Sequence, residues 1–188
     1  AQYGKQCSFP QLLPEFAAVL DQASFEYPAW VKQSVHLGRA LKAADFRLLA
    51  GKEIPENASK AMANVIGVIE DQAPTRHLRL EVAVESGEVH TNLAQDIAKV
   101  ALVERHKGTG GVMVGLVQGF GFTTNCAIAS TVAHDCHHMI VAGTDDEDMA
   151  LAANRLAELG GGQIVVKQGQ VIGQVALPIA GLMSNAHA

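Results

Sequence analysis

Hydrophobic and polar residues alternate along residues 76–90 with the period of a β-strand. Ser86 and Gly87 then supply the residues of a turn. Because side chains of a strand point alternately to its two faces, this pattern predicts a half-buried strand. The apolar positions are Leu78, Leu80, Val82 and Val84.

Other apolar runs predict further strands, and they lie at residues 63–70, 111–122, 126–133 and 137–144. Valines and isoleucines also flank the dipeptide Gln168-Gly169 on both sides within residues 162–178. This arrangement predicts a β-hairpin with its turn at that dipeptide.

A helix is predicted over residues 144–159, where apolar residues recur at intervals of three and four. Thr144 followed by Glu147 fits a capping box. The acidic residues 145–148 suit the positive end of the helix dipole, and they lack the spaced ligands and central glycine of a calcium-binding loop. The predicted buried stripe is Met149, Ala152, Ala153, Leu156 and Leu159.

A second helix is predicted over residues 92–107, and the glycines from Gly108 onward would end it. Residues 103–111 are interpreted as its C-terminus, with presentation of a polar group to a ligand as the alternative. The residues that carry the helical spacing are Leu93, Ile97, Val100 and Ala101.

This mixture of elements predicts an α+β fold with mixed α/β layers, in which a mostly antiparallel or mixed sheet has flanking helices. A complete TIM barrel is not expected, because it needs about 250 residues. Residues 1–62 contain scattered prolines and are interpreted as an N-terminal arm or connecting segment, with a short helix at residues 15–23. Residues 63–188 are predicted to form the main domain.

The composition narrows the class of protein. Hydrophobic residues make up 48% and charged residues 18% of the chain, so most of it is expected to fold. The net charge is −5 and no basic stripe is present, which argues against a nucleic-acid partner. The chain begins with Ala rather than Met, so we expect a processed product or a piece of a larger polypeptide.

Cysteine content and hydropathy suggest a location. The three cysteines form no CxxC pair, which favours a reducing compartment. No apolar run reaches 18 residues, and the N-terminus lacks a signal-peptide core. These features predict a cytoplasmic chain with no membrane partner.

The densest chemistry lies at residues 134–138, HDCHH. In a strand, His134, Cys136 and His138 would share one face as soft ligands for zinc or a similar ion. In a helical turn, His134, His137 and His138 would converge instead. Either set needs a further ligand, and the distant candidates are His106, Glu104 and His77.

A structural interpretation of this cluster has similar weight. A histidine beside an aspartate often forms a hydrogen-bonded pair that fixes a turn. Motifs of other enzyme classes are absent from the sequence: HxH, HExxH, PCxxC, GxSxG, GxGxxG and the Walker loop. The cluster alone leaves metal binding, catalysis and structural pairing open.

A long stretch resembles the C-terminal part of bacterial adenine deaminases: CAIASTVAHDCHHMIVAGTDDEDMALAANRLAELGGGQIVVKQGQVIGQVALPIAGLMS, residues 126–184. The segments ANVIGVIEDQAPTRHL and DIAKVALVERHKGTGGVMVGLVQGFG are similar to the same family. The resemblance implies hydrolysis of adenine to hypoxanthine and ammonia by water activated on paired divalent ions, manganese or iron. It places the main metal ligands in an N-terminal barrel that nothing in this chain matches.

Within the cluster, His134, Asp135 and His137 match the family pattern, whereas the family has Ser and Asn at the positions of Cys136 and His138. The resemblance therefore favours the three matching residues as groups that frame the active site and orient a metal ligand or the purine. It implies a catalytic barrel domain, a purine substrate and a homo-oligomer as partners, and an isolated chain that is inactive.

Two alternatives stay open. The chain could be a non-catalytic structural or oligomerisation module. It could also be an autonomous metal-binding domain that uses the HDCHH cluster, with His134, His137 and His138 as the first candidates for ligands.

Overall fold

One mixed sheet of nine strands runs through the computed structural model, which describes residues 27–184. The strand order is β3-β2-β1-β5-β4-β7-β6-β8-β9, and all neighbours are antiparallel except β1 and β5, which are parallel. The strands are β1 (Lys60–Gly67), β2 (Arg76–Glu85), β3 (Glu88–Val89), β4 (Ile97–Val103), β5 (Val112–Gln118), β6 (Ala127–Ser130), β7 (Met139–Gly143), β8 (Gly162–Lys167) and β9 (Gln170–Ala176).

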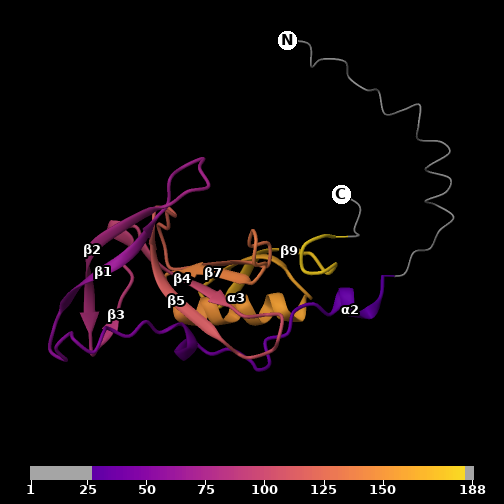
Figure 1. The fold of residues 1–188 in the computed structure, drawn as a ribbon, viewed down its shortest axis with the longest axis horizontal. Coiled ribbons are helices and arrows are strands. Elements are labelled where there is room, and N and C mark those ends of the chain that lie inside the picture. Colours follow the sequence, from indigo (N-terminus) through magenta and orange to yellow (C-terminus); the bar gives the residue numbers. More distant parts are fainter. Residues whose placement is uncertain (1–26, 185–188) are drawn as a thin grey trace, which may run out of the picture.

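Within residues 27–184 the helices are few and mostly short. They are α2 (Ala29–Lys32), α3 (Asp146–Glu158) and the 3-10 turns η2 (Ala43–Phe46) and η3 (Leu93–Gln95). Figure 1 shows α3 lying along one side of the sheet, with β1, β2 and β3 at the end of the molecule opposite α2. The two outermost strands, β3 and β9, do not pair with each other, so the sheet does not close into a barrel. The predicted α+β fold is confirmed.

Helix α3 covers the sheet as its apolar stripe predicts. Met149, Ala152, Ala153 and Leu156 are fully buried, and they pack against a core that includes Val141 of β7 and Ile164 of β8. The helix also holds the β8–β9 hairpin, because the buried Asp148 carboxylate accepts hydrogen bonds from the backbone N–H groups of Gln168 (2.9 Å) and Gly169 (2.7 Å). Both turn residues have positive φ angles of 52° and 72°, as expected for a two-residue hairpin turn.

The predicted cap of this helix is wrong by one residue. Asp145 is the N-cap, and its carboxylate accepts hydrogen bonds from the N–H groups of Glu147 (3.0 Å) and Asp148 (2.9 Å). The hydroxyl of Thr144 instead accepts a hydrogen bond from Cys126 N (3.3 Å). A carboxylate at the cap satisfies free N–H groups of the first turn and also places a negative charge at the positive helix end.

The predicted helix over residues 92–107 is also wrong. Residues 97–103 form β4, which lies between β5 and β7, and only Leu93–Gln95 make a single 3-10 turn. Ile97, Ala101 and Val103 point into the core, whereas Leu102 lies on the other face. Strands with apolar residues on both faces lack a clear alternation, so helical spacing and strand pairing fit the same letters.

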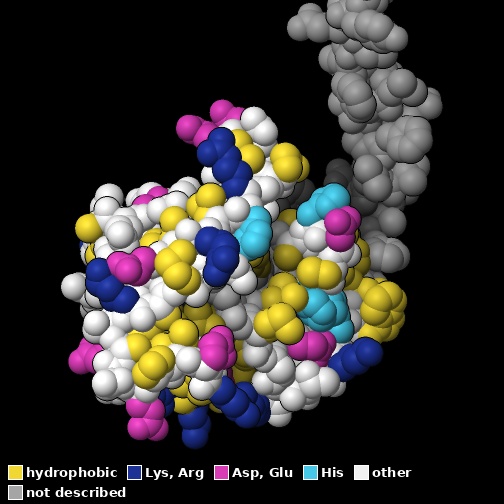
Figure 2. Space-filling model, turned by 60° about the vertical axis from the view of Figure 1, so that its left-hand side comes forward, with side chains coloured by type: hydrophobic (Ala, Val, Ile, Leu, Met, Phe, Trp, Pro, Cys, Tyr) yellow, Lys and Arg dark blue, Asp and Glu magenta, His cyan; other side chains and the backbone are white. Residues whose placement is uncertain are grey.

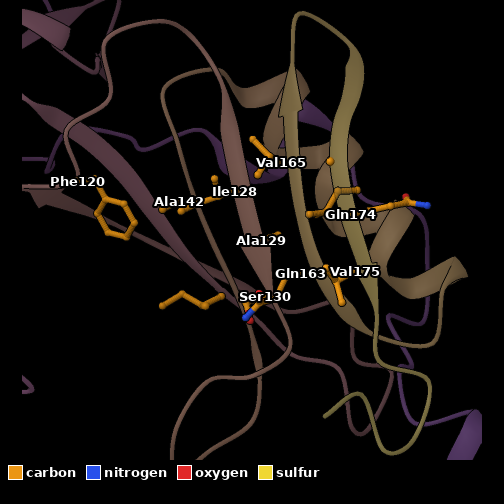
Figure 3. Close-up of a pocket in the computed structure, with 12 residues that line it drawn as sticks. Phe120, Ile128, Ala129, Ser130, Ala142, Gln163, Val165, Gln174 and Val175 are labelled. Carbon is orange, nitrogen blue, oxygen red and sulfur yellow. The ribbon is translucent and has the colours of Figure 1, made fainter. Parts of the chain in front are cut away.

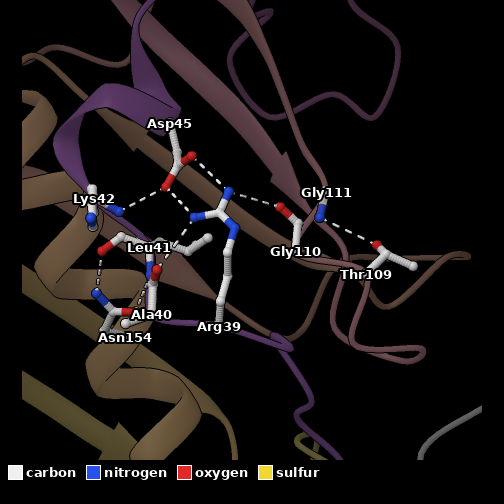
Figure 4. A network of polar contacts seen from close by, with 9 residues as sticks. All are labelled: Arg39, Ala40, Leu41, Lys42, Asp45, Thr109, Gly110, Gly111 and Asn154. Atoms are coloured by element: carbon white, nitrogen blue, oxygen red, sulfur yellow. Dashed lines mark hydrogen bonds and ion pairs between the residues drawn. The ribbon is translucent and has the colours of Figure 1, made fainter.

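The segment before β1 contributes to the core. Leu37, Leu41 and Phe46 belong to the cluster beneath α3. The Arg39 guanidinium binds both oxygens of Asp45 (2.6 and 2.7 Å) and donates to Gly110 O, and the Asn154 amide pairs with the backbone of Leu41 (Figure 4). The division at residue 62 stays a prediction, and the predicted helix at residues 15–23 lies outside the described residues. Between residues 27 and 184, no helix is long and apolar enough to span a membrane.

Candidate functional site

The HDCHH cluster lies in the loop between β6 and β7, residues 131–138, which we call the histidine loop. The loop is a tight turn rather than a strand or a helix. His137 N donates to Ala133 O (2.8 Å) and Cys136 N donates to His134 O (3.0 Å). Asp135 and His137 have positive φ angles of 70° and 48°. Neither geometry considered from the sequence therefore applies.

Thr131 anchors the start of the histidine loop. Its side chain is completely buried, and its hydroxyl donates to Gly181 O and accepts from Gly162 N (2.8 Å). The Thr131 N–H also donates to Gly162 O (3.0 Å). The loop is thus tied to the start of β8 and to the turn at the C-terminal end of the described chain.

Arg105 anchors the end of the histidine loop. Its side chain is only 2% exposed, and it donates hydrogen bonds to the carbonyls of His137, Ser34 (3.0 Å) and Ala180 (3.2 Å). Burial lowers the pKa of this guanidinium from its ordinary value. These neutral partners make Arg105 a bridge between three chain segments rather than half of an ion pair.

His134 and Asp135 project away from this anchored base. Their side chains are 96% and 90% exposed, and His134 Nδ1 lies 3.1 Å from Asp135 Oδ1. A carboxylate beside Nδ1 favours a proton on that nitrogen, which leaves Nε2 as the basic atom. The pair is therefore an exposed imidazole beside a carboxylate, and both are accessible to another domain.

The other histidines lie closer to the protein. The His106 and His138 rings are 4.8 Å apart between centroids. His106 Nε2 lies 3.1 Å from Cys136 O and must donate there, since a carbonyl only accepts. The Nδ1 atoms of His137 and His138 are buried without a hydrogen-bond partner in the part of the chain that is described.

The three distant candidates for a further metal ligand, which are His106, Glu104 and His77, lie in different surroundings. His106 contacts the histidine loop. Glu104 is engaged by its own loop: its carboxylate accepts from the N–H groups of His106, Lys107 (2.8 Å) and Thr109 (3.1 Å). Burial opposes ionisation of Glu104, but hydrogen bonds from Thr109, Lys107 and His106 hold its pKa at about 2. His77 lies on β2, with β1, β5 and β4 between it and β7, and it pairs with Asn64 (3.0 Å).

The described residues do not form a metal site by themselves. Across residues 27–184, no group of three His, Cys, Asp or Glu side chains could hold one metal ion. His134 points outward from the turn, whereas His137 and His138 direct their Nδ1 atoms inward. This chain alone therefore does not bring His134, His137 and His138 together as ligands.

Two buried cations were missed by reasoning from the sequence. Lys99 is 5% exposed on β4 and pairs with both oxygens of Asp146 (2.7 and 2.8 Å). Arg105 lies two residues after the end of the same strand, with Glu104 between them. The available signal was a cation within or just after an apolar strand, and it was hidden because this strand was predicted as a helix.

Fold and site define an α+β domain that presents a firmly anchored, histidine-rich loop. The family model described as the adenine deaminase C-terminal domain matches residues 72–188. The chain therefore belongs to the family of adenine deaminase C-terminal domains.

Individual relatives agree with this assignment. The chain is 52% identical over 170 residues to an adenine deaminase of Ruegeria pomeroyi, covering 90% of this chain and 28% of the relative. It is 49% identical to adenine deaminase 3 of Rhizobium meliloti, with the same coverage. Identity to the adenine deaminase of Moorella thermoacetica is 46%, over 89% of this chain and 27% of that relative. The chain thus spans somewhat more than a quarter of the length of these relatives.

Proposed function

We propose that this chain is the C-terminal domain of an enzyme that hydrolyses adenine to hypoxanthine and ammonia. The observation that carries the proposal is the identity of about half of all residues to adenine deaminases over 90% of the chain. The complete enzyme would work in purine metabolism in the cytoplasm, and the proposal makes this chain inactive when alone.

The metal chemistry belongs, in this proposal, to the part of the enzyme outside this chain. Divalent ions, manganese or iron, would activate water for attack on C6 of the purine. The described residues do not supply a three-ligand group, and the proposal takes the metal ligands from the catalytic barrel domain.

The histidine loop would frame that active site. His134 is held through Asp135 with Nε2 free, which suits it to accept a proton or a hydrogen bond. Arg105 and Thr131 fix the base of the loop, so the exposed pair reaches outward from a rigid support. His137 would contribute through its position in the turn, with its carbonyl held by Arg105.

The function is tested by following adenine loss and hypoxanthine formation by chromatography, together with released ammonia. The complete enzyme should convert adenine, and the 188-residue chain alone should not. Conversion by the chain alone would show that its active site lies within it, and a complete enzyme without adenine turnover would refute the proposal.

The role of the loop needs a separate test in the complete enzyme. His134→Ala should lower kcat on the order of tenfold to a hundredfold, the scale for groups that orient a metal site. The thermal midpoint should stay unchanged because the side chain is exposed. His77→Ala is the matched control, since His77 is an exposed histidine on distant β2. Wild-type turnover in the His134→Ala variant would contradict the proposed role of the histidine loop in the active site.

A further inference from the structure

Within residues 27–184, no helix covers one face of the sheet between β5 and β9, and we call this the open face. Two rows of directly paired residues cross it from β5 to β9. One row is Met113, Leu102, Ile140, Ser130, Gln163 and Val175, and the other is Gly115, Val100, Ala142, Ile128, Val165 and Gly173. None of these residues is charged. Paired residues share a face, and the residues between them in sequence lie on the side of α3.

The open face is apolar and hollowed. Met113 is 76% and Val175 55% exposed at the two ends of one row. A hollow of about 490 Å³ lies over β6, β7, β8 and β9, and a neighbouring one of about 320 Å³ lies over β4 and β5; both include Ile140. Figure 3 shows Val165 and Val175 on one side of the larger hollow and Phe120 on the other.

An apolar sheet face that is exposed to water indicates a binding surface for another protein domain or ligand. Antiparallel sheets that face water carry polar residues on that side, and contiguous exposed apolar surface marks an interaction site. Figure 2 shows one side of the molecule, where exposed hydrophobic side chains and histidines lie between scattered charged ones. The open face fits an apolar protein surface better than it fits a small polar ligand.

We propose that the open face docks against the catalytic barrel domain of the complete adenine deaminase, and this inference rests on the function proposed above. Nearly three quarters of the length of the relatives lies outside the region that this chain matches, so a large further part of the enzyme is present to cover the open face. The position of the histidine loop favours the barrel domain over a second copy of this chain as the partner on the open face. The loop joins Ser130 to Met139, and Ser130 and Ile140 line the larger hollow. A domain seated on the open face therefore lies beside His134 and Asp135.

Docking is tested by thiol labelling at single introduced cysteines, with each labelled peptide quantified by mass spectrometry. Met113→Cys and Val175→Cys mark the two ends of the open face. Leu49→Cys is the control, because Leu49 is 67% exposed and its neighbours Leu48 and Ala50 pack on a different apolar cluster. Each variant is labelled in the 188-residue chain and in the complete enzyme.

We expect labelling at positions 113 and 175 to be slower in the complete enzyme by about tenfold or more, since a buried thiol loses access to the reagent. Position 49 should react at the same rate in both. Equal rates at 113 and 175 in the two proteins would overturn the docking. Slow labelling already in the isolated chain, relieved by dilution, would identify a second copy as the occupant and also overturn it.

The outcomes separate this inference from the function. Protection at positions 113 and 175 in an enzyme that leaves adenine untouched would refute the function and support the docking. Adenine turnover without protection would do the reverse.

Discussion

The two faces of the sheet are built from the same strands and from similar residues, yet they differ in their surroundings. Ala101 and Val141 point towards α3 and are completely buried, whereas their sequence neighbours Leu102 and Ile140 are 39% and 37% exposed on the open face. Both faces are apolar. Hydrophobicity therefore does not say which face of the sheet forms the core of this chain.

The covered face contributes mainly to the stability of this chain, whereas the open face is suited to binding another surface. Removal of apolar area from water stabilises a fold by about 25 cal/mol per Å², and only the covered face receives the full gain within this chain. Apolar side chains on the open face gain it when another surface covers them. Substitutions on the covered face should consequently lower the free energy of unfolding, whereas substitutions on the open face should mainly weaken docking.

The largest effect is expected on the covered face. Leu156→Ala removes a fully buried side chain from the last turn of α3, and we expect the free energy of unfolding to fall by about 3 kcal/mol. Leu102→Ala, at a half-exposed position, should lower it by less than about 1 kcal/mol in the same chain. Urea unfolding measures both. Equal losses would mean that the two faces contribute alike and would break the comparison.

Local sequence signals predicted the elements around the covered face well. Apolar residues at helical spacing and an acidic start defined α3, and Gln168-Gly169 defined the hairpin turn. The strand β4 was mistaken for a helix because Ile97 and Ala101 satisfy both periods. Pairing with β5 and β7 decides between them, and such long-range pairing is invisible in a local window.

The chemistry of the histidine loop was visible in the sequence, but its geometry was not. The residue types of HDCHH mark a polar site in any conformation. The turn depends on positive φ angles at Asp135 and His137 and on the distant Arg105, whose contacts reach Ser34 and Ala180. No spacing rule connects residues that far apart in the chain.

A second, smaller effect is expected where the histidine loop is anchored. Arg105→Met preserves much of the side-chain volume but leaves three carbonyls without their donor. We expect a loss of about 2 kcal/mol, the cost of buried groups left unsatisfied. Amide hydrogen exchange at residues 133–138 should accelerate more than exchange in α3.

The matched variant for this anchor is Arg105→Lys. It retains the positive charge, but a single ammonium cannot reproduce the fork that reaches three segments. Faster exchange in the histidine loop is therefore expected in both variants. Exchange that stays slow in Arg105→Lys would show that charge alone holds the loop.

The smallest effect concerns pH and the loop between β4 and β5. Glu104 has a pKa of about 2 in the folded chain, below its ordinary value of 4.5. As pH falls, the unfolded chain takes up this proton first, so the stabilisation by Glu104 is present above about pH 4.5 and is lost towards pH 2. The difference in unfolding free energy between wild type and Glu104→Gln should accordingly be constant near neutrality and shrink in acid.

The control variant is Leu156→Ala. Its loss of unfolding free energy should not change with pH, because packing of this leucine against the sheet involves no proton. A pH-independent Glu104→Gln difference would mean that the carboxylate does not organise its loop through its charge.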